Sequence, residues 1–357
     1  MKPIDTNSLI IQPTDRILVT GAAGFIGRRV VNALLESGFA NLRCLTRPSS
    51  KLDGLDEVLR AHENSAQVEL MTGNLLSPQD CAAAVEDVAV VFHLAAGRGE
   101  KSFPDAFMNS VVTTRNLMEA CAAQGGVRRF VNMSSFAVYQ NKGNPRGRLL
   151  DESGPVEEHP ELRANAYCFA KTEQDRLVTD YGQRLHIPYV IIRPGWVYGP
   201  GNTGIHGRVG IGTFGIFLHL GGGNTMPLTY VDNCAEAVVL AGLTRDVDGE
   251  VFNVVDDNLP SSRKFLRLYK RNVKRFKSIY VPHAVAYYLC SLWEWYSKWS
   301  KGQLPPAYNR RAWHATWKRT RYSNAKLKSR VGWQPSVPIS EGLQRYFESC
   351  RSGESHA

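Results

Sequence analysis

The chain lacks the sequence features of several protein classes. Its 357 residues contain no internal repeat, no low-complexity tract and no C-x-x-C pair. The seven cysteines are odd in number and widely scattered, so we expect reduced thiols, without a disulfide framework or a metal site. Asp5, Asp15 and Arg16 interrupt the apolar residues near the start, so we expect no signal peptide and a cytoplasmic protein.

Acidic residues are scarce in the last part of the chain. From Asn258 to Ala357 there are 20 Lys and Arg against 4 Asp and Glu, whereas the residues before them carry 23 against 29. This asymmetry indicates an anionic partner for the basic part, either a phosphorylated substrate or an acidic membrane surface. No nucleic-acid-binding module is visible, so nucleic acid is not an expected partner.

Short apolar runs alternate with helical patterns in the first half of the chain. The runs predict strands at 16–20, 42–46, 68–71, 88–94, 130–133 and 189–192. Such alternation predicts an α/β fold with a doubly wound (Rossmann) parallel sheet, joined later by a helix at 230–243 and a strand at 250–255. A smaller, mainly helical unit should follow on the substrate side. We expect a sheet domain of 14–194 plus 230–257, a substrate-binding domain of 195–229 plus 258–347, and a tail of 348–357.

A glycine-rich turn lies between the first predicted strand and the first predicted helix. Gly21 permits the tight turn, Gly24 lets the backbone approach a phosphate, and Gly27 lets the helix pack closely. The free amides and the dipole of the helix then attract a pyrophosphate. This context predicts a dinucleotide site rather than a turn without a ligand.

The residues after the second strand indicate which dinucleotide is bound. An acidic residue at this place holds the ribose hydroxyls of NAD, whereas an arginine accepts the 2′-phosphate of NADP. Arg47 stands here, and no acid occurs before Asp53. The sequence favours NADP over NAD, with Arg47 as the phosphate ligand and Ser49 assisting it. The alternative is that Arg47 stacks on the adenine or faces solvent.

Tyr167 and Lys171 are four residues apart and share one face of a predicted helix. A nearby ammonium stabilises a phenolate, so the pair can take a proton from an alcohol or give one to a forming alkoxide. Ser135 follows the strand at 130–133 and can donate a hydrogen bond to the substrate oxygen. The alternative role for a serine here is to cap the next turn, which we expect of Ser134.

With these motifs in place, the chain resembles an extended short-chain dehydrogenase/reductase of the NAD-dependent epimerase/dehydratase family. Matching positions are 20–27, 93–96, 109, 134–135, 139, 167 with 171, 193–194, 197–200, 230–233 and 331–335. The resemblance covers roughly residues 14 to 347. It implies that Ser135, Tyr167 and Lys171 form the catalytic set and that the enzyme pairs as a homodimer. It implies a cofactor site formed by Gly21, Ala23, Gly24, Phe25, Ile26, Gly27, Arg47, Asn74, Leu75, Leu94, Ala95, Ala96, Lys171 and Arg193.

The substrate is less well indicated. A hydride transfer between nicotinamide and a carbon bearing oxygen is common to all interpretations, and Arg98, Tyr139 and Arg208 are candidate substrate residues, with core packing as the alternative for Tyr139. A 4,6-dehydratase is disfavoured because Phe136 and Ala137 cannot transfer protons. We expect an epimerase or ketoreductase acting on a nucleotide-linked or lipid-linked sugar.

Two alternatives to that function stay open. Residues 224–229 lack the Arg-Asp pair that related nucleotide-sugar enzymes carry before the Tyr-Val-Asp element, which favours a ketoreductase of an apolar substrate. Such an enzyme would resemble 3β-hydroxysteroid dehydrogenases or dihydroflavonol reductases. A non-catalytic dinucleotide sensor is the alternative of another class, and the intact Ser135, Tyr167 and Lys171 argue against it.

Residues 263–299 combine positive charge with aromatic side chains. Eight basic residues and no acids occur from Arg263 to Lys277. Apolar residues then recur at helical spacing and predict one apolar face, made of Val281, Val285, Leu289, Leu292, Trp293, Tyr296 and Trp299. This face either packs on the same chain or another subunit, or makes peripheral contact with an anionic membrane.

Overall fold

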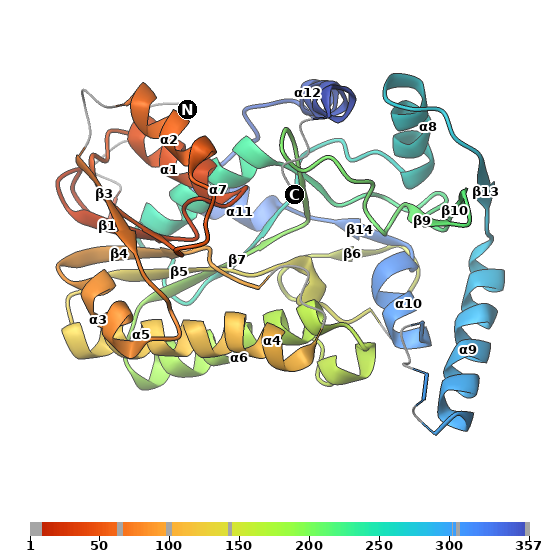
Figure 1. The fold of residues 1–357 in the computed structure, drawn as a ribbon, viewed down its shortest axis with the longest axis horizontal. Coiled ribbons are helices and arrows are strands. Elements are labelled where there is room, and N and C mark those ends of the chain that lie inside the picture. Colours follow the sequence, from red (N-terminus) through yellow and green to blue (C-terminus); the bar gives the residue numbers. More distant parts are fainter. Residues whose placement is uncertain are drawn as a thin grey trace.

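The computed structural model describes residues 9–62, 67–97, 102–141, 145–301, 303–304 and 308–353. A seven-stranded parallel sheet lies at its centre, in the order β12-β7-β5-β4-β1-β2-β3 (Figure 1). The strands are β1 (Arg16–Thr20), β2 (Asn41–Thr46), β3 (Gln67–Thr72), β4 (Val88–His93), β5 (Arg129–Met133), β7 (Tyr189–Pro194) and β12 (Val251–Val254). The predicted doubly wound sheet is confirmed.

Both faces of the sheet are buried, as its apolar strands require. In β1, Ile17 and Val19 belong to one core cluster, and Leu18 between them belongs to the cluster on the opposite face. Side chains alternate across a strand, so a run without polar residues is suited to a sheet covered on both sides.

The helices that cover the sheet form two layers (Figure 1). One layer contains α1 (Gly27–Glu36), α2 (Asp53–Ala61) and α7 (Val231–Leu243). The other contains α3 (Pro78–Val85), α4 (Phe103–Phe107), a π-helical turn at Met108–Val112, α5 (Thr113–Gln124) and α6 (Ala166–Arg184). Short 3-10 turns at Phe136–Val138 and Pro160–Arg163 precede α6.

The strand order places a ligand crevice beside β1. The chain fills one half of the sheet with β1, β2 and β3, and then crosses to the other side of β1 with β4 and β5. The loops after β1 and β4 therefore diverge in opposite directions at the carboxyl ends of the strands, where such sheets bind ligands. The glycine turn follows β1 at this point.

Residues 195–229 contain four short strands that periodicity did not predict. These are β8 (Trp196–Tyr198), β9 (Gly210–Thr213), β10 (Ile216–His219) and β11 (Leu228–Tyr230). β8 pairs with β11, while β10 pairs with β9 and with β13 (Ser278–Tyr280). Likewise β6 (Arg148–Leu150) pairs with β14 (Thr320–Tyr322). The three-residue strands pair with partners far away in the chain, so they leave no local pattern, whereas β9 and β10 form a short local hairpin. Tyr230 ends β11, and the predicted helix begins at Val231.

The C-terminal part is mainly helical, as expected. Its helices are α8 (Ser262–Asn272), α9 (His283–Trp299), α10 (Arg310–Trp317), α11 (Ala325–Val331) and α12 (Ile339–Ser352). This part also packs on the sheet domain, because Trp333 is 1% exposed and its indole N–H donates to the Asn233 carbonyl at 3.2 Å. The domain boundaries given above stay a prediction.

Most residues of the predicted apolar face of α9 are exposed and do not pack on their own chain. Leu289, Leu292 and Trp299 are more than half exposed. Two members of the predicted face pack inward: the Trp293 and Tyr308 ring centroids are 5.9 Å apart, and Val281 packs against the cluster of Leu220 and Trp313. Within the ranges that the structure describes, no helix combines the length and the apolar character needed to cross a bilayer.

Candidate active site

The glycine turn has the backbone geometry that a bound pyrophosphate requires. Gly21 has a φ of 70°, and a Cβ there would lie 2.8 Å from the Ala95 backbone nitrogen. A Cβ on Gly27 would lie 2.0 Å from the Gly21 carbonyl oxygen. Only glycine fits these two positions, because the turn, the first helix and the loop after β4 meet without space for a side chain.

The start of α1 leaves its positive end open. The N-cap residue Ile26 makes no side-chain capping hydrogen bond, and the first turn contains no acidic residue. Gly24 is exposed just before this helix. Free amides and an uncompensated helix dipole attract an anion, so the residues present fit a dinucleotide pyrophosphate.

The other predicted cofactor residues surround the same crevice. Ala23, Phe25 and Ile26 are half-buried in the turn after β1, and Leu94, Ala95 and Ala96 follow β4. The Ala95 amide donates to Thr20 Oγ1 at 3.3 Å, which holds the two loops together. Asn74 is exposed after β3 and Leu75 beside it is buried, while Arg47 is exposed at the end of β2. The structure brings these residues to the carboxyl ends of four neighbouring strands.

Lys171 connects the catalytic helix to the end of β5. Its side chain is almost fully buried, and its ammonium donates to the Met133 carbonyl at 2.6 Å and to Gln174 Oε1 at 2.8 Å. Tyr167 lies one turn earlier on α6 and is 37% exposed. Ser135 comes two residues after Met133, so the three predicted catalytic residues share one end of β5 and α6. The buried lysine and the accessible phenol suit a stabilising and a reacting group, respectively.

Ser135, and not Ser134 as expected, caps the turn after β5. Ser135 Oγ accepts a hydrogen bond from the Ala137 amide at 3.1 Å and caps the 3-10 turn that follows. Ser134 is buried beside Asp175 instead, and its hydroxyl counteracts the raised pKa of that carboxyl group. The Ser135 hydroxyl can still donate its own proton to a substrate oxygen while it accepts from Ala137.

A chain of buried hydrogen bonds joins the catalytic lysine to the glycine turn. From Lys171 it passes through Gln174 to Thr114 Oγ1 at 2.8 Å, then to His93 Nε2 at 2.8 Å, and from His93 Nδ1 to Thr20 Oγ1 at 2.9 Å. Burial, with a smaller effect of the Lys171 charge, lowers the pKa of His93 to about 3. The histidine is therefore neutral near pH 7.

The available acceptors determine which group donates in each of these hydrogen bonds. The Thr114 hydroxyl donates to the Ser110 carbonyl at 2.5 Å, so its oxygen accepts from His93 Nε2–H. His93 Nδ1 then accepts from the Thr20 hydroxyl, whose oxygen accepts the Ala95 amide. Every member of the chain has a partner, which keeps the lysine and the cofactor turn in one fixed arrangement.

Two further candidate residues are held in a buried cluster. Arg193 Nε donates to Asp175 Oδ2 at 3.0 Å, and its guanidinium lies 4.8 Å from the centroid of the Tyr139 ring. The Tyr139 hydroxyl donates to Asn253 Oδ1 at 2.7 Å, and the residue is 3% exposed. This placement favours core packing for Tyr139, and its substrate role and the cofactor role of Arg193 stay predictions.

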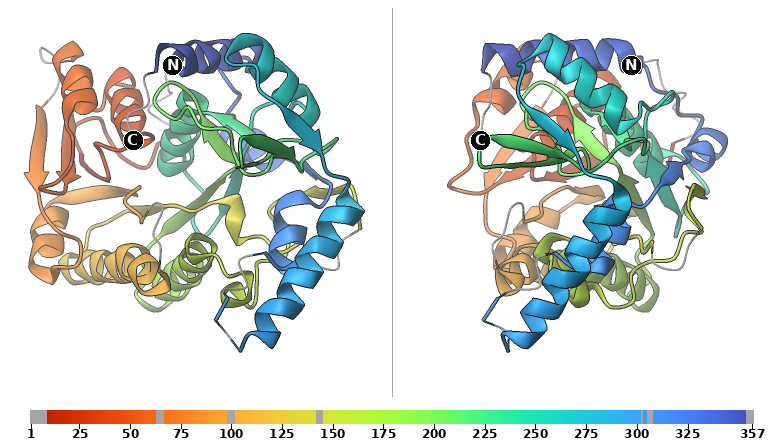
Figure 2. Two further views of the ribbon diagram at one scale, coloured as in Figure 1. Left: turned by 45° about the vertical axis from the view of Figure 1, so that its right-hand side comes forward. Right: turned by 90° about the vertical axis from the view of Figure 1, so that its right-hand side faces the viewer.

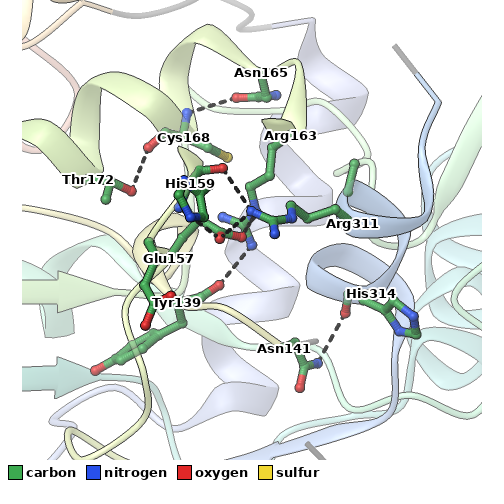
Figure 3. Close-up of polar contacts among 12 residues, drawn as sticks. Tyr139, Asn141, Glu157, His159, Arg163, Asn165, Cys168, Thr172, Arg311 and His314 are labelled. Carbon is green, nitrogen blue, oxygen red and sulfur yellow. Dashed lines mark hydrogen bonds and ion pairs between the residues drawn. The ribbon is translucent and has the colours of Figure 1, made fainter. Parts of the chain in front are cut away.

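Arg163 and Arg311 lie beside the Glu157 carboxylate (Figure 3). Arg163 donates to the carbonyls of Ala137 and Tyr139, and the buried Glu157 carboxylate pairs with Arg163 at 3.4 Å and with Arg311 at 2.9 Å. The cluster joins the loop after Ser135 to α10. Because both arginines contact Glu157 and Arg163 also contacts backbone carbonyls, the cluster fixes the loop after Ser135 against α10.

Arg208 is half-buried. Its Nη1 donates to the Thr316 carbonyl at 3.0 Å and to the Tyr322 hydroxyl at 3.3 Å. Gly207, Phe217 and Tyr308 help to line one cavity of about 590 Å³, and Tyr322 lines a second of about 270 Å³. Arg208 itself lines neither space, and its role as a substrate residue stays a prediction. Arg98 lies outside the described residues.

Motif analysis did not predict a role in the site for residues 93, 114 and 174. Gln174 had a local signal, because it is three positions after Lys171 and shares a helix face with it. Thr114 had none, since its helix reaches the site only through the tertiary fold.

The sequence matches a family model. Residues 17–254 match the model of the NAD dependent epimerase/dehydratase family. The chain belongs to this family. The resemblance expected from the motifs is therefore confirmed, and the family's cofactor is NAD. Membership of this family agrees with ketone and alcohol chemistry at the site.

Individual relatives are distant. A UDP-glucose 4-epimerase from Mycolicibacterium smegmatis is 28% identical over 353 residues, covering 94% of this chain and 99% of that protein. A trifunctional UDP-glucose 4,6-dehydratase/UDP-4-keto-6-deoxy-D-glucose 3,5-epimerase/UDP-4-keto-L-rhamnose-reductase from Arabidopsis thaliana is 27% identical over 266 residues, 67% of this chain. The chain spans only 36% of that protein's length, and about half of another curated relative.

A solved structure agrees in fold. UDP-glucuronic acid 4-epimerase from Bacillus cereus, in complex with NAD, superimposes with a TM-score of 0.70 at 22% identity, covering 95% of this chain and all of that one. At this identity the likeness concerns the fold alone.

Proposed function

We propose that this protein transfers a hydride between NADP(H) and a secondary alcohol or ketone of a sugar, linked to a nucleotide or to a lipid. One observation carries the proposal: the buried Lys171 ammonium, tied to the end of β5, lies one helical turn from the accessible Tyr167 phenol. When bound, the nicotinamide cofactor supplies the hydride donor or acceptor. The glycine turn, the loop after β4 and Lys171 are the residues that would hold it.

Each catalytic side chain has one task. The Tyr167 hydroxyl gives its proton to the forming alkoxide in reduction, or takes it from the alcohol in oxidation. The Lys171 ammonium stabilises the phenolate that results. The Ser135 hydroxyl donates to the same substrate oxygen as negative charge develops there.

Removing the phenol oxygen tests this assignment. Tyr167→Phe should lower kcat by at least about 100-fold, since general acid–base groups typically contribute 100- to 10,000-fold. Cofactor affinity, measured by fluorescence titration, should stay within about twofold. Tyr181→Phe is the matched control, because this tyrosine lies on the same helix and bonds only weakly to Glu119 at 3.3 Å. Equal turnover of Tyr167→Phe and the wild type would contradict the role of Tyr167, whereas a wild type that binds cofactor without turnover would favour a sensor.

The preference for NADP is proposed from charge. The Arg47 side chain is exposed at the end of β2 and makes no ion pair with any described residue, so it can meet a 2′-phosphate. Arg47→Glu should weaken NADPH binding by at least about tenfold relative to NADH, the effect of losing roughly 1.4 kcal/mol and adding repulsion. Lys51→Glu, an exposed charge reversal in the same loop, is the control. An unchanged NADPH/NADH ratio in Arg47→Glu would show that Arg47 does not bind the 2′-phosphate, and a wild type that binds NADH more tightly than NADPH would show a preference for NAD.

Cofactor turnover distinguishes an epimerase from a reductase. An epimerase returns its hydride to the same substrate and ends with the cofactor unchanged, so tightly retained NAD(H) on the purified protein would favour it. A protein purified without cofactor that oxidises added NADPH in step with ketone loss would favour a reductase. Deuterium carried from position 4 of NADPH into the product is the readout.

A ketoreductase of an apolar substrate is the second candidate. The segment before Tyr230 supports it, because Asn224 is buried and bonded to the Trp317 carbonyl, and Met226 is 1% exposed. This segment packs in the core instead of presenting an arginine to a diphosphate. Activity on steroid or flavonoid ketones, without activity on nucleotide sugars, would select this candidate.

Two proposals concern partners. A homodimer is proposed from the family resemblance, and light scattering of the purified protein tests it. A peripheral contact with an anionic membrane through residues 263–299 is proposed from charge and aromatic content.

A further inference from the structure

Helix α9 carries its apolar residues on the side that faces away from the protein. Seven large side chains are 44–69% exposed, namely Val285, Tyr288, Leu289, Leu292, Trp295, Tyr296 and Trp299. Their spacing of three and four residues places them on one stripe, called here the aromatic stripe. Side chains of this size, half exposed, present several hundred Å² of apolar area, more than single surface residues account for.

The opposite face of α9 attaches the helix to the protein. Ala286, Cys290 and Ser297 are buried, and the first two pack in a small core with Leu220 and Trp313 of α10. Trp293 adds a ring contact to Tyr308. The inner face is therefore fixed by these contacts, so the aromatic stripe cannot turn inward without loss of this packing.

A basic segment lies on the same side of the molecule. Figure 2 shows α8 and α9 following one another along this side, joined by β13. All basic residues from Arg263 to Lys277 except Lys270 are exposed. Ile279 and Tyr280, 55% and 43% exposed, continue the apolar surface between the two helices.

We propose that α9 docks on an anionic phospholipid bilayer, with the aromatic stripe at the boundary between headgroups and acyl chains and the basic segment against the phosphates. Trp and Tyr prefer this boundary over both water and hydrocarbon. Each lysine or arginine near an anionic surface adds attraction, so about seven exposed charges favour acidic over neutral lipid. This inference rests on the peripheral contact proposed above and names the surface that makes it.

Charge argues against a second copy of the chain as the occupant. A twofold interface places the same patch on both subunits, and either end of the stripe is positive. The basic segment lies before α9, and Lys298 and Lys301 are exposed at its other end. Antiparallel or parallel pairing of two stripes would bring like charges together, whereas acidic lipid neutralises both ends.

Docking would bring the substrate side close to the bilayer. Tyr308, which contacts Trp293 of α9, also lines the cavity of about 590 Å³ next to Arg208. A lipid-linked sugar can therefore present its polar group to the site while its tail stays in the membrane.

Vesicle sedimentation tests the proposal on the full chain. The wild type should bind vesicles containing about one third phosphatidylglycerol at least tenfold more than pure phosphatidylcholine, and about 0.5 M salt should reduce this binding strongly. Trp295→Ser combined with Trp299→Ser should lower binding at least tenfold. Leu70→Ser is the matched control, because Leu70 is 44% exposed on the edge strand β3, outside the stripe. NADPH affinity is measured for every variant, so loss of cofactor binding is distinguished from loss of docking.

A measurement on the wild type needs no variant. Spin-labelled lipids placed in anionic vesicles should quench tryptophan fluorescence, with shallow labels more effective than deep ones. Absence of quenching, or equal binding of the double variant and the wild type, would overturn the proposal. So would a wild-type dimer that dissociates in the double variant while neither protein binds vesicles, since the stripe would then join two copies.

Discussion

His93 shows how one buried side chain connects two parts of the site. It contacts Thr20 next to the glycine turn and Thr114, and through Thr114 and Gln174 it reaches Lys171. A neutral imidazole is required, because one ring nitrogen accepts and the other donates. Burial keeps the ring neutral by lowering its pKa to about 3.

This depressed pKa predicts a pH-dependent stability. Unfolding returns the His93 pKa toward 6.5, so the unfolded chain binds one more proton between about pH 3 and 6.5. The contribution of His93 is therefore fully present above pH 6.5 and is lost as the pH falls. Between pH 7.5 and 5.5 this loss should be about 1.4 kcal/mol of unfolding free energy.

His93→Gln should remove this dependence. The variant should be less stable than the wild type at pH 7.5 by about 1–3 kcal/mol, because buried hydroxyls lose their partner. Between pH 7.5 and 5.5 it should lose about 1.4 kcal/mol less than the wild type. Urea unfolding at both pH values measures this, with the exposed His159→Gln as control. His206, whose pKa burial also lowers to about 3, contributes equally to both proteins and cancels. Parallel pH profiles would contradict the assignment.

The turn between β1 and α1 requires glycine at position 27. Gly27→Ala would force a Cβ to 2.0 Å from the Gly21 carbonyl oxygen, so the helix must move away from the strand. We expect a loss of about 1–3 kcal/mol of stability. Cofactor affinity should fall at least about tenfold because the helix amides no longer meet the pyrophosphate.

Calorimetry and NADPH titration measure the two effects. Gly204→Ala is the control, because a Cβ there meets nothing within 4 Å and its φ is not positive. If Gly27→Ala bound cofactor as well as Gly204→Ala does, the close approach of helix and strand would have no role in binding.

Across the whole molecule, Trp333 fastens the C-terminal part to the sheet domain. It is 1% exposed and donates to the Asn233 carbonyl of α7. Trp333→Ala should cost about 3–5 kcal/mol, the usual range for a large buried aromatic residue, and should lower the unfolding temperature of the entire protein in one transition.

Trp299→Ala gives the contrast within the same chain. This tryptophan is 67% exposed, so the unfolding free energy should change by less than about 0.5 kcal/mol. Two separate thermal transitions in Trp333→Ala would instead show that the two parts fold independently.

Local patterns predicted the central sheet and the cofactor turn. Each strand of the sheet from β1 to β7 is mainly apolar, although Arg43 lies within β2, Glu69 within β3 and Asn132 within β5. The turn residues Gly21, Gly24 and Gly27 lie within seven positions of the chain. Tyr167 and Lys171 were predicted for the same reason, since four residues on a helix define a shared face. Thr114 and Asp175 were not, because their places depend on how α5 and α6 pack against the sheet.

The sequence by itself determined three features: the family, the order of strands and helices along the chain, and the amphipathic character of α9. Each of them depends on residues that are close together in the sequence. Tertiary structure alone decided which side of α9 faces solvent, which serine caps the turn after β5, and which tryptophan turns inward. Periodicity defines a face but carries no direction, and that direction depends on which side of α9 small residues such as Ala286 and Cys290 can pack against α10.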